Sequence, residues 1–195
     1  MSRVLGPETA KSHMDRHKCW VIGFYQHYMQ GIGLDIGYKG SMPDVLPVLP
    51  SAIGIDHDYP GYDGVWLPFG DQTQDYVFSS HCLEHIPNYD TALQEWFRVL
   101  KVGGYLIVIV PHKWLYEKKE ILPSRWNSDH KRYYPPSAVL QEIEESLEPN
   151  TWRLRHMRDN DDGYDYAIGP DQHPTGCYEI ECVIQKIQPP TWEIK

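Results

Sequence analysis

Hydrophobic and polar positions fall into blocks along the chain, and each block has the length of a single strand or helix. Short apolar runs that stop at polar or glycine residues predict four strands, at 33–36, 52–55, 75–80 and 105–110. The run Tyr105–Val110 is the most strongly apolar. Its β-branched residues are typical of a strand that is buried on both faces of a parallel sheet.

Three longer segments carry apolar residues at the three- and four-residue steps of a helix. We expect one amphipathic helix over 8–29 that ends near Gly31, a second over 89–100, and a third over 137–147 that Ser137 caps. Because strands alternate with helices, we predict a doubly wound α/β fold with a mostly parallel sheet.

The C-terminal part has a different pattern. Residues 151–157 and 178–187 read as strands with no helix between them, so we expect an antiparallel hairpin at one edge of the sheet. The acidic loop between them, residues 158–176, is long enough to be functional or mobile. No repeat or linker divides the sequence, so we expect a single domain over residues 1–195, with a helical segment at 1–30.

Charge and composition exclude several classes of partner. Acidic residues outnumber basic ones by 27 to 18, a net charge of −9, which gives no general attraction for a nucleic-acid backbone. The longest apolar stretch is far too short for a membrane span, and the polar N-terminus lacks the core of a secretory signal, so we expect a cytoplasmic protein. The four cysteines show no CxxC pair, and we interpret them as reduced and structural.

Candidate chemistry lies at the ends of the predicted strands, because open α/β sheets bind ligands outside the carboxyl ends of their strands. Asp56 closes the second strand, 21 residues after Asp35 near the end of the first. This is the interval at which dinucleotide folds place a carboxylate on ribose hydroxyls. Together the two carboxylates favour a nucleoside ligand.

Five short segments follow one another along the predicted sheet: Gly33–Gly37, Ile53–Asp56, Leu67–Phe69, Ser79–Pro87 and Arg98–Gly104. In the order and spacing of these segments the chain resembles class I S-adenosylmethionine-dependent methyltransferases. It implies S-adenosylmethionine as cofactor and a Rossmann-like, seven-stranded sheet whose last two strands form an antiparallel edge. It also implies a cofactor-binding half at 31–115 and a substrate-side half at 116–195.

Carried over residue by residue, the resemblance implies a set of cofactor-binding residues. Asp35, Gly37 and Gly40 would lie under the methionine part, Asp56 on the ribose, Asp63 against the adenine amine, and Ser80 and His81 beside the sulfonium. Lys39 departs from the family pattern, because it stands where the second glycine of the first loop is usual. It could contact the methionine carboxylate, or Gly40 could take over that glycine's role.

Methyl transfer to a hydroxyl requires a base near the sulfonium, and histidine is the side chain best matched to neutral pH. Our hypothesis is that His85 or His112 is the base, with Glu84 or Asp129 as its orienter. His130 is a third catalytic candidate on the predicted ligand face.

The segment 126–135 resembles one found in methyltransferases of saccharide and natural-product biosynthesis. Lys131 and Arg132 could hold the phosphate of a nucleotide sugar, and Trp126 and Tyr133 could pack on a sugar face. We therefore expect methylation of an oxygen on a small polar acceptor, such as a sugar or nucleotide sugar in glycan biosynthesis. We assign no metal site, since Asp129–His130 are adjacent and the run 159–162 has the character of a solvated loop.

Two alternatives stay open at this point. The chain could be a non-catalytic module that works through a protein partner, for which Lys39 is the sequence support. It could also be a nicotinamide oxidoreductase, although the full GxGxxG pattern is absent after the first strand. A chain of 195 residues has little room for a separate acceptor domain, so a neighbouring subunit of a homodimer could complete the pocket.

Overall fold

A computed structural model describes residues 4–17, 23–39, 42 and 44–192 of the chain. Gly40 of the predicted cofactor loop and Cys19 lie outside these ranges. The strands are β1 Gly33–Ile36, β2 Ala52–Ile55, β3 Gln74–Ser80, β4 Leu100–Pro111, β5 Trp152–Asn160 and β6 Glu179–Lys186. The helices are α1 Pro7–His17, α2 Phe24–Tyr28, α3 Tyr89–Val99 and α4 Pro136–Ser146, with short helical turns at Leu83–His85 and Lys113–Glu117.

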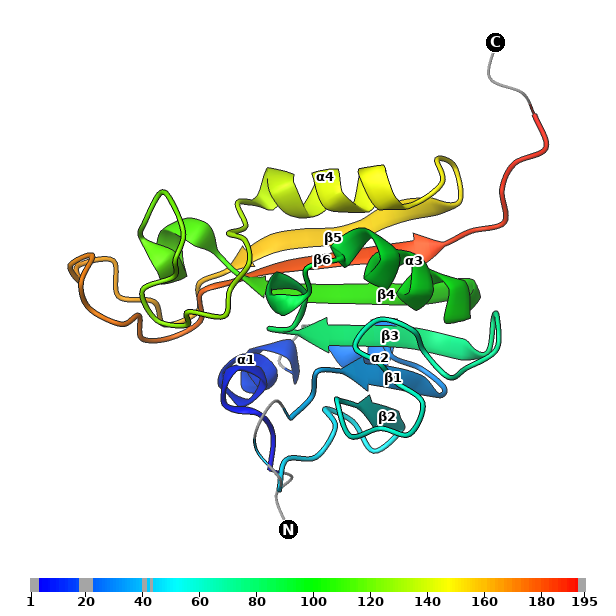
Figure 1. The fold of residues 1–195 in the computed structure, drawn as a ribbon, viewed down its shortest axis with the longest axis horizontal. Coiled ribbons are helices and arrows are strands. Elements are labelled where there is room, and N and C mark those ends of the chain that lie inside the picture. Colours follow the sequence, from blue (N-terminus) through cyan, green and yellow to red (C-terminus); the bar gives the residue numbers. More distant parts are fainter. Residues whose placement is uncertain (1–3, 18–22, 40–41, 43, 193–195) are drawn as a thin grey trace.

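The six strands form one sheet in the order β2-β1-β3-β4-β6-β5 (Figure 1). The pairs β2–β1, β1–β3 and β3–β4 are parallel, whereas β6 runs antiparallel to both β4 and β5. The predicted α/β class and the antiparallel hairpin at one edge are therefore confirmed.

The prediction of seven strands is wrong, because the described residues form six. The missing strand would follow β2, but residues 56–73 make only turns before β3 begins. An additional parallel strand between β2 and β3 would need one crossover to reach it and a second to leave it, each of a dozen or more residues and usually with a helix. This segment is short and is interrupted by Pro60, Gly61, Gly64, Pro68 and Gly70, so it remains a loop.

Two predictions about helices also need correction. The single N-terminal helix is instead two helices, since Gly23 before α2 has the extended angles φ −54° and ψ 155°. Part of the predicted helix, with the apolar residues Trp20 and Val21, lies outside the described residues. Ser137 does not cap α4: the helix starts at Pro136, whose fixed φ suits the first helical turn, and Pro135 occupies the cap position.

Two apolar layers cover the sheet. On one face α3 and α4 pack against Val77 of β3 and alternate residues of β4 around the fully buried Trp96. On the other face Phe24 and Tyr25 of α2 pack against Tyr76 and Phe78 of β3 and the intervening residues of β4. This alternation is the period-two pattern of a sheet buried on both faces.

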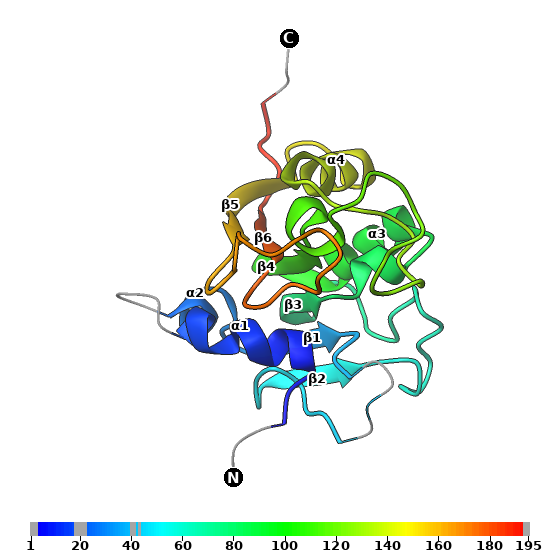
Figure 2. The same ribbon diagram turned by 90° about the vertical axis from the view of Figure 1, so that its left-hand side faces the viewer.

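Figure 2 looks onto the end of the sheet where β1 and β3 finish. Helix α1 and the loops 112–135 and 161–178 gather at this end, with α3 and α4 to one side and α2 to the other. Among the described residues, no helix combines the length and apolar character needed to cross a bilayer.

Candidate functional site

Three adjoining cavities surround Gly37 at the carboxyl end of β1. Their volumes are about 260, 560 and 140 Å³, and Gly37 lines all three. The first lies against the loop 56–73, the second against His81, His85 and Asp129, and the third against the start of α1. The shared glycine makes them parts of one elongated site.

Gly37 itself has no room for a side chain. Its φ is +73°, and its amide donates to the carbonyl of Ile55 over 2.8 Å. A Cβ at this position would lie 2.6 Å from both Cβ and Sγ of Cys82. The backbone can therefore turn sharply and face the cavity only because the residue is glycine. Burial raises the pKa of the Cys82 thiol to about 12, so this wall of the cavity is neutral.

Asp56 is buried at the end of β2 and lines two of the cavities. Its Oδ1 accepts the amide of His57 over 2.8 Å, and its Oδ2 accepts the amide of Lys39 over 3.3 Å. The carboxylate thus ties the ends of β1 and β2 together. The Nζ of Lys39 lies 2.5 Å from Oδ2 of Asp58, and this hydrogen bond raises the pKa of Lys39.

Asp63 lies at the far end of the same cavity as Asp56. Its Oδ1 accepts the amides of Val65 and Trp66 over 3.0 and 2.7 Å, and the hydrogen bond from Trp66 is the main cause of its lowered pKa. The loop is itself fixed by Tyr62, whose hydroxyl donates to the carbonyl of Gly64 over 2.9 Å. Asp63 is therefore a charged carboxylate on an ordered turn.

Asp35 takes a different place from the one that the resemblance implies. It is buried within β1, where its Oδ2 accepts the amide of Val48 over 2.7 Å, and it does not line the three cavities. Its side chain fastens the segment before β2 to the sheet. Gly40, which lies outside the described residues, is not placed.

At the end of β3, Ser80 and His81 line the cavity beside α1. Ser80 is 7% exposed, and its Oγ has no hydrogen-bond partner among the described residues. His81 has a φ of +53°, a left-handed conformation that non-glycine residues adopt at a cost. Such strain is often found where a side chain must be aimed into a site.

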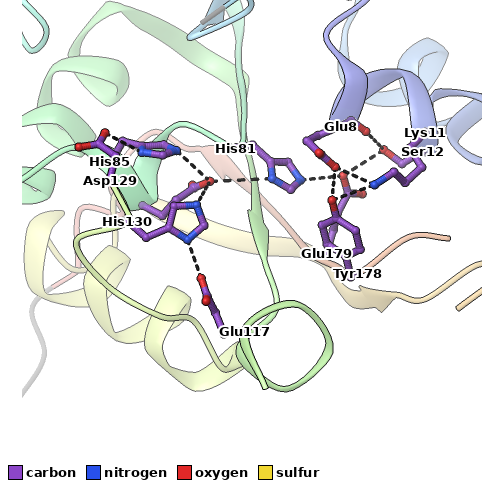
Figure 3. Close-up of polar contacts among 11 residues, drawn as sticks. Glu8, Lys11, Ser12, His81, His85, Glu117, Asp129, His130, Tyr178 and Glu179 are labelled. Carbon is purple, nitrogen blue, oxygen red and sulfur yellow. Dashed lines mark hydrogen bonds and ion pairs between the residues drawn. The ribbon is translucent and has the colours of Figure 1, made fainter. Parts of the chain in front are cut away.

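His81 is surrounded by carboxylates. Its Nε2 lies 3.1 Å from Oε1 of Glu179, and its Nδ1 lies 3.9 Å from Oε1 of Glu84 (Figure 3). Burial alone would lower the pKa of His81, but the hydrogen bond to Glu179 and the charges of Glu179, Glu84 and Glu8 outweigh that effect and raise it. Helix α1 supports this arrangement, because the Ser12 hydroxyl donates to Oε1 of Glu179 over 3.1 Å.

Two of the predicted catalytic histidines lie next to each other. The ring centroids of His85 and His130 are 4.8 Å apart, and each ring contacts a carboxylate through Nδ1. His85 Nδ1 lies 3.0 Å from Oδ2 of Asp129, and His130 Nδ1 lies 2.6 Å from Oε1 of Glu117 (Figure 3). The two Nε2 atoms lie 3.8 and 3.9 Å from Oε1 of Glu84.

His112, the third predicted catalytic histidine, stands apart from this group. Its Nδ1 accepts the amide of Trp114 over 3.0 Å, and its Nε2 lies 3.6 Å from Oδ1 of Asp159. Burial lowers its pKa, although the charge of Asp159 acts in the opposite direction. Neither His112 nor His130 lines the three cavities, whereas His85 lines two of them.

The cations predicted to hold a phosphate are already engaged. Arg132 donates to the carbonyls of Leu83, Ile86 and Pro87 over 2.8, 2.7 and 3.1 Å. Lys131 Nζ lies 2.7 Å from Oδ1 of Asp129. Arg132 therefore holds the turn that precedes α3, and Lys131 holds the partner of His85.

Sequence reasoning missed three carboxylates of this region: Glu8, Glu117 and Glu179. Glu179 left a recognisable signal, because a charged residue in the apolar strand β6 is buried and must have partners. Glu117 and Glu8 left no such signal in the sequence, because their partners, His130 and Tyr178, come close only in the tertiary fold.

Comparisons with known proteins agree with this architecture. Residues 58–108 match the family model described as a methyltransferase domain. No curated protein matches the sequence.

Among solved structures, the chain is similar to a SAM-dependent methyltransferase from Aquifex aeolicus, with 14% identity, 93% of this chain and 94% of that chain covered, and a TM-score of 0.55. It is also similar to the Burkholderia thailandensis 1,6-didemethyltoxoflavin-N1-methyltransferase, solved with S-adenosylhomocysteine, with 13% identity, 93% and 80% covered, and a TM-score of 0.58. A SAM-dependent methyltransferase from Archaeoglobus fulgidus gives 14% identity, 92% and 94% covered, and a TM-score of 0.56.

At such low identities the structural likeness establishes the fold alone. The match to the family model is a separate observation and concerns residues 58–108. The chain therefore has the fold of S-adenosylmethionine-dependent methyltransferases, and its residues 58–108 match a methyltransferase-domain model.

Proposed function

We propose that the chain is an S-adenosylmethionine-dependent methyltransferase that acts on a hydroxyl oxygen of a small, uncharged polar acceptor, with a sugar as the favoured class. The observation that carries the proposal is the pair His85 and Asp129, which lines both the 260 Å³ cavity and the 560 Å³ cavity. A histidine held by a carboxylate at the junction of two cavities is suited to receive a proton from an acceptor.

The residues present fit the cofactor. Asp56 can accept the two ribose hydroxyls, and Asp63 can accept the adenine amine. The buried and unpartnered Oγ of Ser80 supplies a free hydrogen-bonding group at the methionine end. When bound, S-adenosylmethionine supplies a methyl group activated by a positive sulfonium.

Lys39 is compatible with this assignment. It lines the 140 Å³ cavity, and its side chain follows the wall to Asp58. We place the methionine carboxylate near this ammonium group, so that Lys39 supplies a charge where most of the family has a glycine. The pairing of Lys39 with Asp58 at the cavity wall supports a catalytic cofactor site over the non-catalytic alternative.

We place the acceptor in the 560 Å³ cavity, called the acceptor cavity below. Its lining favours hydroxyl groups over phosphates. Its polar lining includes His85, Asn127 and Asp129, which can exchange hydrogen bonds with a polyol. Arg132 donates to three backbone carbonyls, and Lys131 is paired with Asp129, so neither cation is available for a diphosphate. A sugar therefore fits better than a nucleotide sugar.

His85 is better placed than His112 to meet the acceptor's hydroxyl. Because its Nδ1 faces Asp129, the ring carries its proton there and leaves the Nε2 lone pair directed towards the interior. His112 uses Nδ1 to accept the amide of Trp114 and lies away from the cavities. We therefore assign the role of general base to His85.

The cofactor assignment is tested by calorimetric titration of the full chain with S-adenosylhomocysteine. We expect micromolar affinity, about 8 kcal/mol of binding free energy. Asp56→Asn should weaken binding about tenfold or more, because one ribose hydrogen-bond acceptor is lost. Asp90→Asn, on the exposed start of α3, is the control. Equal affinity in the wild type and Asp56→Asn would contradict the assignment.

The acceptor assignment is tested by methyl transfer to free sugars and to nucleotide sugars. We expect turnover with the former, and a loss of kcat in His85→Gln of about 10²- to 10⁴-fold. Affinity for S-adenosylhomocysteine should stay within about twofold. His156→Gln is a matched control, because both imidazoles face a carboxylate and their side chains are 25% and 26% exposed. Preference for nucleotide sugars would refute the sugar assignment.

A further inference from the structure

Two histidines converge on one buried carboxylate behind the wall of the acceptor cavity. His85 Nε2 lies 3.8 Å from Oε1 of Glu84, and His130 Nε2 lies 3.9 Å from the same oxygen. One ligand atom from each residue lies within 4.8 Å of the others. These distances are too long for hydrogen bonds, so the three side chains point at a common centre without bonding one another.

Glu84 is a buried carboxylate whose contacts with charged or chargeable groups, in the described part of the chain, are three histidine nitrogens at 3.8–3.9 Å, beyond hydrogen-bond distance. Its side chain is 0% exposed, and neither carboxylate oxygen has a hydrogen bond among the described residues. A buried carboxylate without donors is costly, and native proteins pair such groups with a cation or a metal ion. The orphaned carboxylate is thus a second observation, independent of the histidine geometry.

In each histidine the ring nitrogen that points away from Glu84, Nδ1, contacts a second carboxylate. The Nδ1 atoms of His85 and His130 contact Asp129 and Glu117 over 3.0 and 2.6 Å (Figure 3). Ser124 in turn donates to Glu117 over 2.7 Å. A carboxylate on one ring nitrogen fixes the proton there and leaves the other nitrogen as a ligand. Both Nε2 lone pairs therefore face Glu84.

The distances between the three side chains are slightly longer than those around a bound metal ion. A tetrahedral ion with bonds of about 2.1 Å separates neighbouring ligand atoms by about 3.4 Å. The observed 3.8 and 3.9 Å to Oε1 of Glu84 exceed this value by a few tenths of an ångström, and the ligand atoms of the two histidines, which lie within 4.8 Å of each other, would have to move closer as well. His81 approaches the same oxygen from a different direction and keeps its own carboxylate partner, Glu179 (Figure 3).

We propose that Glu84, His85 and His130 bind one divalent transition-metal ion of the zinc or iron(II) class, with an open coordination position towards the acceptor cavity. Two imidazoles and one carboxylate favour these ions over magnesium or calcium, which prefer all-oxygen sites. Of the three residues, His85 lines the cavity, whereas Glu84 and His130 are buried. The open coordination position therefore lies on the side of His85.

The role of the ion rests on the proposed function. At the open position the ion would hold the acceptor's hydroxyl oxygen and favour transfer of its proton to the carboxylate of Asp129, which lines the same cavity. In the metal-bound chain His85 would hold the ion through Nε2, whereas in the metal-free chain His85 is the general base that the proposed function names. The metal site itself stands on the three side chains and does not depend on the identity of the acceptor.

The test uses the full chain, stripped of metal by a chelator and titrated with Zn²⁺ and, separately, Mg²⁺. We expect one Zn²⁺ per chain and no comparable binding of Mg²⁺. Glu84→Gln and His130→Asn should each weaken Zn²⁺ binding by more than about tenfold. His156→Gln, whose histidine faces a carboxylate outside the cluster, should bind zinc as the wild type does.

Visible spectroscopy of the wild type with Co²⁺ supplies a measurement that needs no variant to fold. Intense ligand-field bands of a four- or five-coordinate ion support the site, whereas the weak spectrum of hydrated Co²⁺ overturns it. Unchanged zinc affinity in folded Glu84→Gln also overturns it.

S-adenosylhomocysteine titration of the same samples separates this proposal from the proposed function. Cofactor binding without zinc binding rejects the metal site alone. Zinc binding without cofactor binding leaves the metal site intact and rejects the proposed function.

Discussion

At the scale of single residues, Gly37 allows the sharp backbone turn that borders the proposed cofactor cavity. Gly37→Ala would add a left-handed strain of about 1–2 kcal/mol and a steric conflict of about 1–3 kcal/mol. The conflict arises because the new Cβ would lie 2.6 Å from Cys82. We expect about 3 kcal/mol lower free energy of unfolding in urea and a weaker affinity for S-adenosylhomocysteine.

Gly103→Ala is the control for this experiment. Gly103 has a φ of +91°, and a Cβ added there would meet no atom within 4 Å, so this position shares the backbone strain and lacks the conflict. Its substitution should cost about 1–2 kcal/mol and leave cofactor affinity unchanged. Equal losses of stability in the two variants would show that the contact with Cys82 is unimportant.

His112 gives the protein a dependence of stability on pH. Its pKa in the folded state is lowered by burial from the ordinary value of about 6.5. Above that value both states are neutral at this position, and the residue contributes nothing to the dependence. As the pH falls below about 6.5 the unfolded chain takes up the proton first, so the free energy of unfolding decreases.

We therefore expect the wild type to lose stability more steeply than His112→Asn between about pH 7 and pH 5. Asparagine preserves an acceptor for the amide of Trp114 and removes the titration. Urea unfolding of both proteins across this range is the measurement. Curves that stay parallel throughout the range would exclude His112 as the source.

At the scale of elements, α3 holds the loop 56–73 that replaces the missing strand. Arg98 donates to the carbonyls of Phe69 and Leu67 over 2.9 and 3.2 Å and pairs with the buried Glu95. Glu95 in turn accepts the amide of Leu67 over 3.1 Å. The loop that carries Asp63 is thus fixed by one helix face.

Arg98→Met should lower the free energy of unfolding by about 2–3 kcal/mol, because Glu95 keeps its charge and loses its cation. It should also weaken binding of S-adenosylhomocysteine, since the turn around Asp63 loosens. Lys101→Met is the control: its pair with Asp75 is more exposed and is worth less than about 1 kcal/mol. Urea unfolding and calorimetry measure both effects. If Arg98→Met leaves the affinity for S-adenosylhomocysteine unchanged, the order of the loop 56–73 does not contribute to cofactor binding.

At the scale of the whole molecule, the net charge of −9 opposes association with nucleic acid. We expect no saturable binding of a short RNA or DNA duplex in fluorescence anisotropy, even at low salt, where electrostatic attraction is strongest. Tight binding that weakens steeply with salt would reveal a local basic surface and contradict this expectation.

Much of the fold could be predicted because its signals are local. The apolar runs 33–36 and 52–55 are found as strands with those bounds, and the helix at 89–100 ends one residue early. The number of strands could not be inferred in this way, because the resemblance supplied seven and the short loop after β2 allows only six. The broken N-terminal helix was missed because the apolar spacing continues across Gly23.

The sequence by itself determined which residues end the strands, and with them Gly37, Asp56, Ser80 and His81, because hydrophobic period and turn chemistry act between near neighbours. The tertiary structure alone decided that Asp35 holds Val48 and that Lys39 meets Asp58. It also joined Glu84, His85 and His130 into one cluster. These contacts depend on how separate segments pack, which no local pattern of residues encodes.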